Sequence, residues 1–117
     1  MSSSLPSEAA LSAWAASCQK TPRLALRVNL RRSTLEAVRE KLEAAGASVE
    51  PSPPLPGALL VSGGGEPRLL PGFKEGEWTV QDPGAQAVAL LARPPCGGVV
   101  LDLCAAPGGK TAHLAGI

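Results

Sequence analysis

Cysteine and histidine are scarce in this chain of 117 residues. It contains three cysteines, Cys18, Cys96 and Cys104, and a single histidine, His113. Because the cysteines are odd in number and lack the paired spacing of zinc ligands, the sequence predicts neither a disulfide framework nor a metal site. A reducing compartment, the cytoplasm, fits these thiols best. A histidine without a visible partner is typical of packing or helix capping rather than of proton transfer.

Long apolar runs and export signals are also missing. No run approaches the ~18 apolar residues that a membrane-spanning helix needs. The segment Met1–Pro6 carries no basic side chain, and Glu8 interrupts the stretch that would form the apolar core of a signal peptide. We therefore expect neither a membrane protein nor an exported one.

Charge is nearly balanced, with a net charge of +1, but its distribution is uneven. No acidic residue lies between Glu8 and Glu36, whereas this stretch contains five basic residues: Lys20, Arg23, Arg27, Arg31 and Arg32. A run of charges is most often a solvated face, and a net charge near zero neither requires nor excludes a nucleic acid partner. The basic stretch therefore needs other evidence before it points to RNA.

A helical lead-in is predicted over residues 1–22. Residues 7–18 are rich in alanine, and four residues recur on one helical face: Leu11, Trp14, Ala15 and Cys18. This spacing predicts that Trp14 packs into a core. Pro22 ends the segment.

A half-buried strand is predicted over residues 24–31, where the side chains alternate between two faces. One face carries Leu24, Leu26, Leu30 and Val28, and the other carries Ala25, Arg27, Asn29 and Arg31. A period of two residues is that of a strand with one apolar face. The polar residues of this strand should therefore share an open or functional face.

A small α+β domain is predicted over residues 23–72. Apolar residues at helical spacing predict a helix over residues 34–45, capped by Ser33 or Thr34, with Arg39 and Glu43 placed to pair. Two short strands follow at 48–50 and 58–62, separated by a proline-rich segment that excludes regular structure.

The second part of the chain, residues 73–117, begins with a predicted strand over residues 78–80. Asp82 then provides a helix N-cap and Pro83 a first helical residue. This helix should end at Leu90 to Ala92, before two prolines. The boundary between the two parts is predicted near residues 71–77.

The pattern of the last twenty residues predicts a cofactor-binding unit. The apolar run of residues 99–104, bounded by glycines, is typical of a buried parallel strand. A tight loop rich in alanine and glycine follows it, and Lys110 starts a helix. Because glycine allows main-chain N–H groups to approach a ligand closely, this order favours cofactor binding.

These residues resemble a known family, the RNA cytosine-C5 methyltransferases of the Sun/Fmu type, and especially their RsmB-like members that act on 16S ribosomal RNA. The resemblance runs from about Arg23 to the last residue. Its motifs are Leu26-Arg27-Val28-Asn29, Leu70-Pro71-Gly72-Phe73, Val80-Gln81-Asp82-Pro83-Gly84-Ala85-Gln86, and Leu101-Asp102-Leu103-Cys104-Ala105-Ala106-Pro107-Gly108-Gly109-Lys110-Thr111. The fold it implies is α/β: a small α+β domain on the RNA side, followed by the beginning of a Rossmann-like methyltransferase domain.

The resemblance also implies the site residues. S-adenosyl-L-methionine would be held by Cys104, Ala105, Ala106, Pro107, Gly108, Gly109 and Lys110. Asp102 would either accept from the cofactor amine or cap the amides of the loop, and Gln81 and Asp82 match a segment that borders the pocket. Four arginines are the RNA-binding candidates: Arg23, Arg27, Arg31 and Arg32.

In the resembled family, two cysteines located after the cofactor loop carry the reaction. One thiolate adds to C6 of the cytosine, and the second assists release after methyl transfer. Cys96 precedes the loop, so we interpret it as a loop residue and assign no catalytic residue. We expect the chain to be an N-terminal piece of a longer enzyme and inactive alone.

Two other functions fit parts of the sequence. Gly109-Lys110-Thr111 matches the end of a phosphate-binding P-loop, but Cys104 stands where the first glycine would be, and Pro107 removes an N–H donor. The second alternative is a non-catalytic RNA-binding or interaction module that uses the four arginines.

Overall fold

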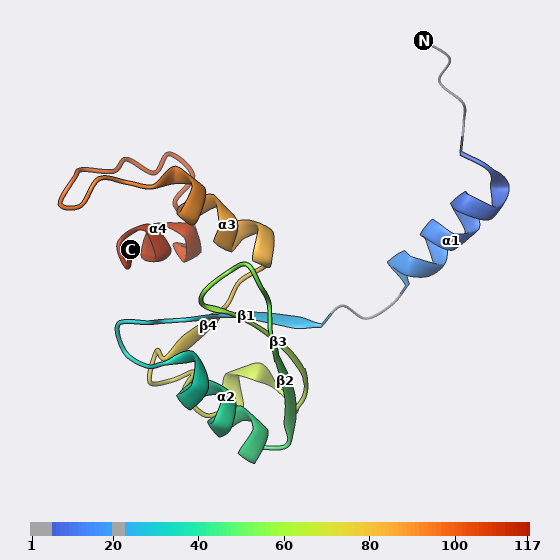
Figure 1. Ribbon diagram of the computed structural model, residues 1–117, viewed down its shortest axis with the longest axis horizontal. Coiled ribbons are helices and arrows are strands. Elements are labelled where there is room, and N and C mark those ends of the chain that lie inside the picture. The colour runs from blue at the N-terminus through green and yellow to red at the C-terminus, as the bar shows by residue number, and fades with distance from the viewer. Residues whose placement is uncertain (1–5, 20–22) are drawn as a thin grey trace, which may run out of the picture.

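The structure, a computed structural model, describes residues 6–19 and 23–117. The end of the lead-in at Pro22 lies outside these residues. The elements follow in the order α1 (Glu8–Cys18), β1 (Leu24–Val28), α2 (Leu35–Ala44), β2 (Ala47–Pro51), β3 (Ala58–Gly63), η1 (Pro67–Leu69), β4 (Trp78–Val80), α3 (Pro83–Ala92) and α4 (Gly109–Leu114). Figure 1 shows them along the chain.

The described strands form one antiparallel sheet with the order β2-β3-β1-β4. Strand β3 lies between β1 and β2, so β1, α2 and β2 form a split β-α-β unit. The short 3₁₀ helix η1 stands in the connection from β3 to β4. The predicted small α+β domain is therefore confirmed. The sheet includes residues on both sides of the expected boundary at 72–73, and we propose that the small unit extends to Val80.

Helix α2 covers one face of the sheet because its apolar side chains recur at helical spacing. Its N-terminus is capped by Thr34, whose hydroxyl accepts from the N–H of Ala37 at 3.2 Å. Val38 and Leu42 are fully buried against the sheet. The core consists of Leu26, Val28, Val38, Leu42, Ala47, Val49, Leu59, Val61, Leu70 and Trp78.

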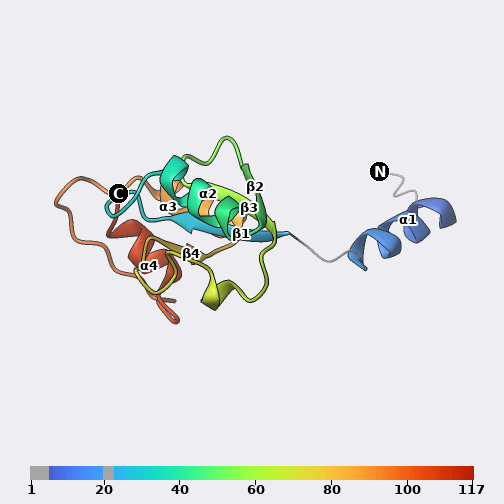
Figure 2. The ribbon, with the colours of Figure 1, turned by 90° about the horizontal axis from the view of Figure 1, so that it is seen from below.

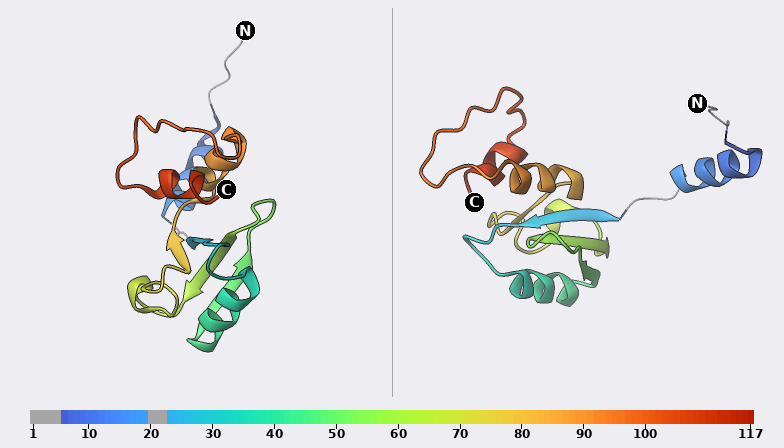
Figure 3. Two further views of the ribbon diagram at one scale, coloured as in Figure 1. Left: turned by 90° about the vertical axis from the view of Figure 1, so that its left-hand side faces the viewer. Right: turned by 45° about the horizontal axis from the view of Figure 1, so that its top comes forward.

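Helices α3 and α4 pack on each other and lie on the opposite side of the sheet from α2, as Figures 1 and 3 show. Helix α3 begins as predicted, with Asp82 at the N-cap position and Pro83 in the first turn. The Asp82 side chain makes no capping hydrogen bond to its helix, so proline and tertiary contacts define this helix start.

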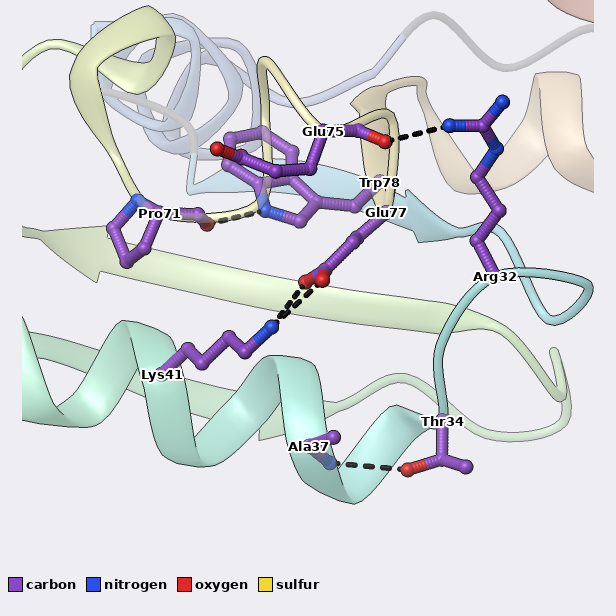
Figure 4. Close-up of polar contacts among 8 residues, drawn as sticks. All are labelled: Arg32, Thr34, Ala37, Lys41, Pro71, Glu75, Glu77 and Trp78. Carbon is purple, nitrogen blue, oxygen red and sulfur yellow. Dashed lines mark hydrogen bonds and ion pairs between the residues drawn. The ribbon is translucent and has the colours of Figure 1, made fainter.

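The segment of residues 71–77 is fastened to the sheet domain by three contacts, shown in Figure 4. Lys41 Nζ binds both carboxylate oxygens of Glu77 at 2.7 and 2.8 Å. Arg32 donates to the carbonyl of Glu75 at 2.9 Å, and Trp78 Nε1 donates to the carbonyl of Pro71 at 2.8 Å. These contacts hold the residues that lead into β4.

Two sequence predictions about the first helix and the first strand are wrong. Trp14 is 68% exposed, and α1 stands apart from the sheet in Figures 1 and 2, so no part of the described chain buries its apolar face. Strand β1 ends at Val28, because residues 30–32 turn toward α2; Leu30 is consequently exposed rather than inward.

The predicted buried strand at residues 99–104 is also wrong in this structure. The segment forms no strand, residues 103–104 lie in a turn, and Val99, Leu101 and Leu103 are largely exposed. An extended segment becomes a strand only when a neighbour supplies hydrogen bonds to its main chain. Among the described residues, no strand pairs with this segment.

Candidate functional site

The glycine-rich loop connects the segment of residues 99–104 to α4. Gly108 is the N-cap of α4 and has a φ of +106°, a conformation that glycine adopts far more readily than other residues. A Cβ at this position would meet no atom within 4 Å. The main chain at Gly108 is therefore open to an approaching group.

Asp102 joins the two ends of this loop. Its Oδ1 accepts from the N–H of Cys104 at 2.9 Å, and its Oδ2 accepts from the hydroxyl of Thr111 at 2.6 Å. The hydrogen bond from Thr111, followed by that from Cys104, lowers the pKa of Asp102. Of the two roles considered for Asp102, the structure contains the one in which it caps loop amides.

The structure places the seven predicted cofactor residues around the loop without enclosing them in a single cavity. Pro107, Gly108 and Gly109 line a pocket of about 400 Å³. Cys104 and Lys110 line a second, and Ala105 a third. Ala106 is exposed between them.

Gln81 lies against the loop from the side of the sheet. It is 8% exposed, and its Oε1 has no hydrogen-bond partner among the described residues. A Cβ added at Gly109 would stand 3.6 Å from Gln81 Nε2, so the amide packs beside the main chain of the loop. A buried polar atom without a partner is costly unless another group satisfies it.

The four candidate RNA-binding arginines do not form one patch. Arg23 pairs with Glu50 on β2, and Arg32 donates to the carbonyl of Glu75. Arg27 and Arg31 point instead toward α4: Arg27 Nη2 lies 3.5 Å from the carbonyl oxygen of Gly109, and Arg31 Nε lies 3.2 Å from that of Gly116.

His113 lies in the last turn of α4 and lines a pocket together with Arg27 and Val28 of β1. Burial, and then the positive charge of Arg27, lowers the pKa of His113, which keeps the imidazole neutral at pH 7. Its Nδ1 has no partner within the described part of the chain.

Other site expectations concern thiols, metals and membranes. All three cysteines are described, and each is free and exposed. Among residues 6–19 and 23–117 there is no cluster of three or more metal-ligating side chains. No helix in the same ranges is long and apolar enough to cross a membrane.

Gln86 is a positioning residue to which sequence reasoning assigned no role. It is 1% exposed, and its Nε2 donates to the carbonyls of Leu26 at 3.1 Å and Gln81 at 2.9 Å. A glutamine inside an apolar helical pattern was the available signal. The pattern did not indicate which carbonyls it would reach.

Comparisons with known proteins agree with this architecture. The "ribosomal RNA small subunit methyltransferase B" of Xylella fastidiosa is 48% identical over 89 residues, covering 76% of this chain and 21% of that protein. The protein of the same name from Salmonella newport is 44% identical over 93 residues, covering 80% and 22%. The chain thus spans about a fifth of the length of these curated relatives.

A solved structure and a family model give the same result. The crystal structure of PH0851 matches with a TM-score of 0.78 at 34% identity, covering 83% of this chain and 22% of that one. The model for the ferredoxin-like domain of RsmF/B-like methyltransferases matches residues 2–66, and the strand order described above is the order of that fold. The chain therefore belongs to the RsmF/B-like methyltransferase family and carries its ferredoxin-like domain.

Proposed function

We propose that this chain contributes the cofactor loop and part of the RNA-facing surface to an enzyme that methylates C5 of a cytosine in 16S ribosomal RNA. The methyl donor is S-adenosyl-L-methionine. Family membership supports methyl transfer, and the names of the relatives, which are ribosomal RNA methyltransferases, support the substrate class.

The observation that carries the proposal is the open main chain at Gly108, held by Asp102. The Asp102 carboxylate fixes both ends of the loop through Cys104 and Thr111, so the loop need not be ordered by the ligand. Preorganised main-chain donors lower the entropic cost of binding. The residues that hold the donor in this proposal are Cys104, Ala105, Ala106, Pro107, Gly108, Gly109 and Lys110.

Individual side chains have distinct tasks toward the donor. When bound, S-adenosyl-L-methionine supplies an electrophilic methyl group and carries an α-carboxylate and an α-amine. The exposed Lys110 ammonium provides positive charge for the carboxylate. Gln81 fits this environment because its buried Oε1 still needs a donor.

RNA contact is assigned to Arg23 and Arg32, at the two ends of the β1 region. Both are exposed, and each uses one guanidinium nitrogen for a protein contact, which leaves further N–H groups for phosphates. No catalytic residue is assigned within these 117 residues. The exposed free thiols agree with a reducing compartment, the cytoplasm.

Titration calorimetry of the chain tests the cofactor assignment. Saturable binding of S-adenosyl-L-methionine, with no binding of ATP, supports the proposal. Gly108→Val should abolish it, because a side chain then fills the open approach to the main chain. Gly65→Val is the matched control, since Gly65 has a φ of +86° and equally open surroundings away from the loop. Binding of ATP in place of the donor would instead indicate a P-loop.

A further inference from the structure

Two arginines from the sheet domain contact the two ends of α4. Arg27, on β1, has its Nη2 3.5 Å from the carbonyl oxygen of Gly109, the first residue of the helix. Arg31, in the turn after β1, donates through Nε to the carbonyl of Gly116 at 3.2 Å, just past the last helical turn. The two contacts span the whole helix.

Arg27 is half-buried, which distinguishes it from the exposed Arg23 and Arg32. Burial lowers the pKa of Arg27, and its Nε is enclosed, without a partner among the described residues. The side chain lines two pockets that lie between the sheet and α4. The guanidinium is therefore partly committed to the space between β1 and α4, through its enclosed Nε and through Nη2 beside Gly109.

The contact of Arg31 is electrostatically favourable on its own. Carbonyl groups at the C-terminal end of a helix lack intrahelical donors and carry partial negative charge. A guanidinium is well suited to this position, because it donates directional hydrogen bonds and remains charged. Arg31 thereby couples the turn after β1 to the end of α4.

Whatever holds α4 also holds the glycine-rich loop. The helix begins directly after Gly108, and Thr111 in its first turn is hydrogen-bonded to Asp102 at the other end of the loop. A displacement of α4 relative to the sheet would therefore pull on both ends of the loop. Gln81, which packs beside Gly109, would lose its neighbour in the same movement.

We infer that Arg27 and Arg31 are positioning residues that clamp α4, and with it the glycine-rich loop, against the sheet domain. They connect the RNA-side domain to the loop, and this role requires no contact with RNA. The inference concerns contacts within the chain and does not require the methyl-donor proposal to be correct.

Amide hydrogen exchange of the chain without any ligand tests the clamp. The reporters are the hydrogen-bonded amides of α4 and its end, Ala112, Ala115 and Gly116. Arg31→Met keeps the length of the side chain and removes the hydrogen-bond donor. In this variant we expect these amides to exchange about tenfold faster, because one charge-assisted hydrogen bond that protects the helix is lost. Arg31→Lys, which keeps charge and donor, should recover part of the protection. Arg27→Ala should also accelerate the α4 amides.

Matched controls separate the clamp from a general loss of stability or of charge. The amide of Val38 in α2 should keep its protection in both Arg31 variants. Arg23→Ala removes a cation beside the same strand but contacts Glu50, so it should leave the α4 amides unchanged. Because Arg31 is exposed, its replacement leaves no buried cavity. If Arg27→Ala unfolds the chain, the result for Arg31→Met therefore decides the test.

The opposite results would overturn the inference. Unchanged α4 exchange in Arg31→Met would show that the contact with Gly116 does not hold the helix. Equal acceleration of Val38 and the α4 amides in that variant would show a global effect. RNA affinity that falls in Arg27→Ala and Arg31→Met, with α4 protection intact, would return both residues to the RNA surface.

Discussion

The side-chain amide of Gln86 lies 3.1 Å from the main-chain carbonyl oxygen of Leu26, sixty residues earlier in the chain. The same nitrogen donates to the carbonyl of Gln81 at 2.9 Å. One buried side chain therefore fixes the start of α3 to the central strand β1 and to the exit from β4. This amide therefore contributes to the orientation of α3 relative to the sheet.

Replacement of Gln86 should consequently destabilise the chain. In Gln86→Leu, which has a similar volume, two buried carbonyls lose their side-chain donor, at a cost of about 1–3 kcal/mol in the free energy of unfolding. Urea denaturation measures this change. Val88→Ala, at an exposed position of the same helix, should change the free energy by less than about 0.5 kcal/mol. Equal effects of the two substitutions would contradict the assigned role.

Gly72 and Gly84 should respond oppositely to alanine. Gly72 has a φ of +88°, and a Cβ there would lie 2.8 Å from Nε1 of the buried Trp78. We expect Gly72→Ala to lower the free energy of unfolding by at least about 1 kcal/mol, because it strains the backbone and displaces the indole. Gly84 lies in α3 with open space around it, so Gly84→Ala should stabilise by about 0.5–1 kcal/mol. Thermal unfolding of both variants checks the contrast, and destabilisation by both would refute it.

Acid should loosen the glycine-rich loop. Because the Thr111 and Cys104 hydrogen bonds lower the pKa of Asp102, its contribution is complete above the ordinary value of 3.8 and is lost as the pH falls through the lower, folded-state value. The Cys104 amide resonance should report this transition in an NMR pH titration. In Asp102→Ala the transition at this amide should vanish. A titration midpoint above 3.8 would contradict the predicted direction.

RNA binding should depend on Arg23 and Arg32. If each arginine neutralises one phosphate, the double alanine variant should bind a 16S RNA fragment more weakly. The slope of the logarithm of the binding constant against the logarithm of the salt concentration should also become shallower, by about two units or less. Arg39→Ala, which removes an exposed cation paired with Glu43 on α2, serves as the control. An unchanged salt slope in the double variant would remove both residues from the RNA surface.

Local patterns were sufficient to predict most of the sheet domain. The predicted helix over 34–45 matches α2 with Thr34 as its cap, and the Arg39–Glu43 pair forms at 3.3 Å. The strands predicted at 48–50, 58–62 and 78–80 are β2, β3 and β4. These elements combine turn residues, capping and periodicity within a few positions, and each signal agrees with the others.

Features that depend on distant neighbours were not predictable. The spacing around Trp14 describes a helix face but not whether anything covers it, and residues 99–104 have strand composition without a partner among the described residues. The alternation in β1 placed Arg27 and Arg31 on one face. It carried no information that α4, some eighty residues later, would occupy that face. Side-chain contacts between remote segments require the fold itself.

Chemical-shift mapping of the isotopically labelled chain tests the central claim most directly. On titration with S-adenosyl-L-methionine, the amide resonances of Gly108, Gly109 and Lys110 should shift saturably, while those of the α2 helix stay in place. ATP at the same concentration should leave the three resonances unchanged. Shifts of these amides with ATP alone, or donor binding that leaves all three unmoved, would contradict the assignment of this loop to the methyl donor.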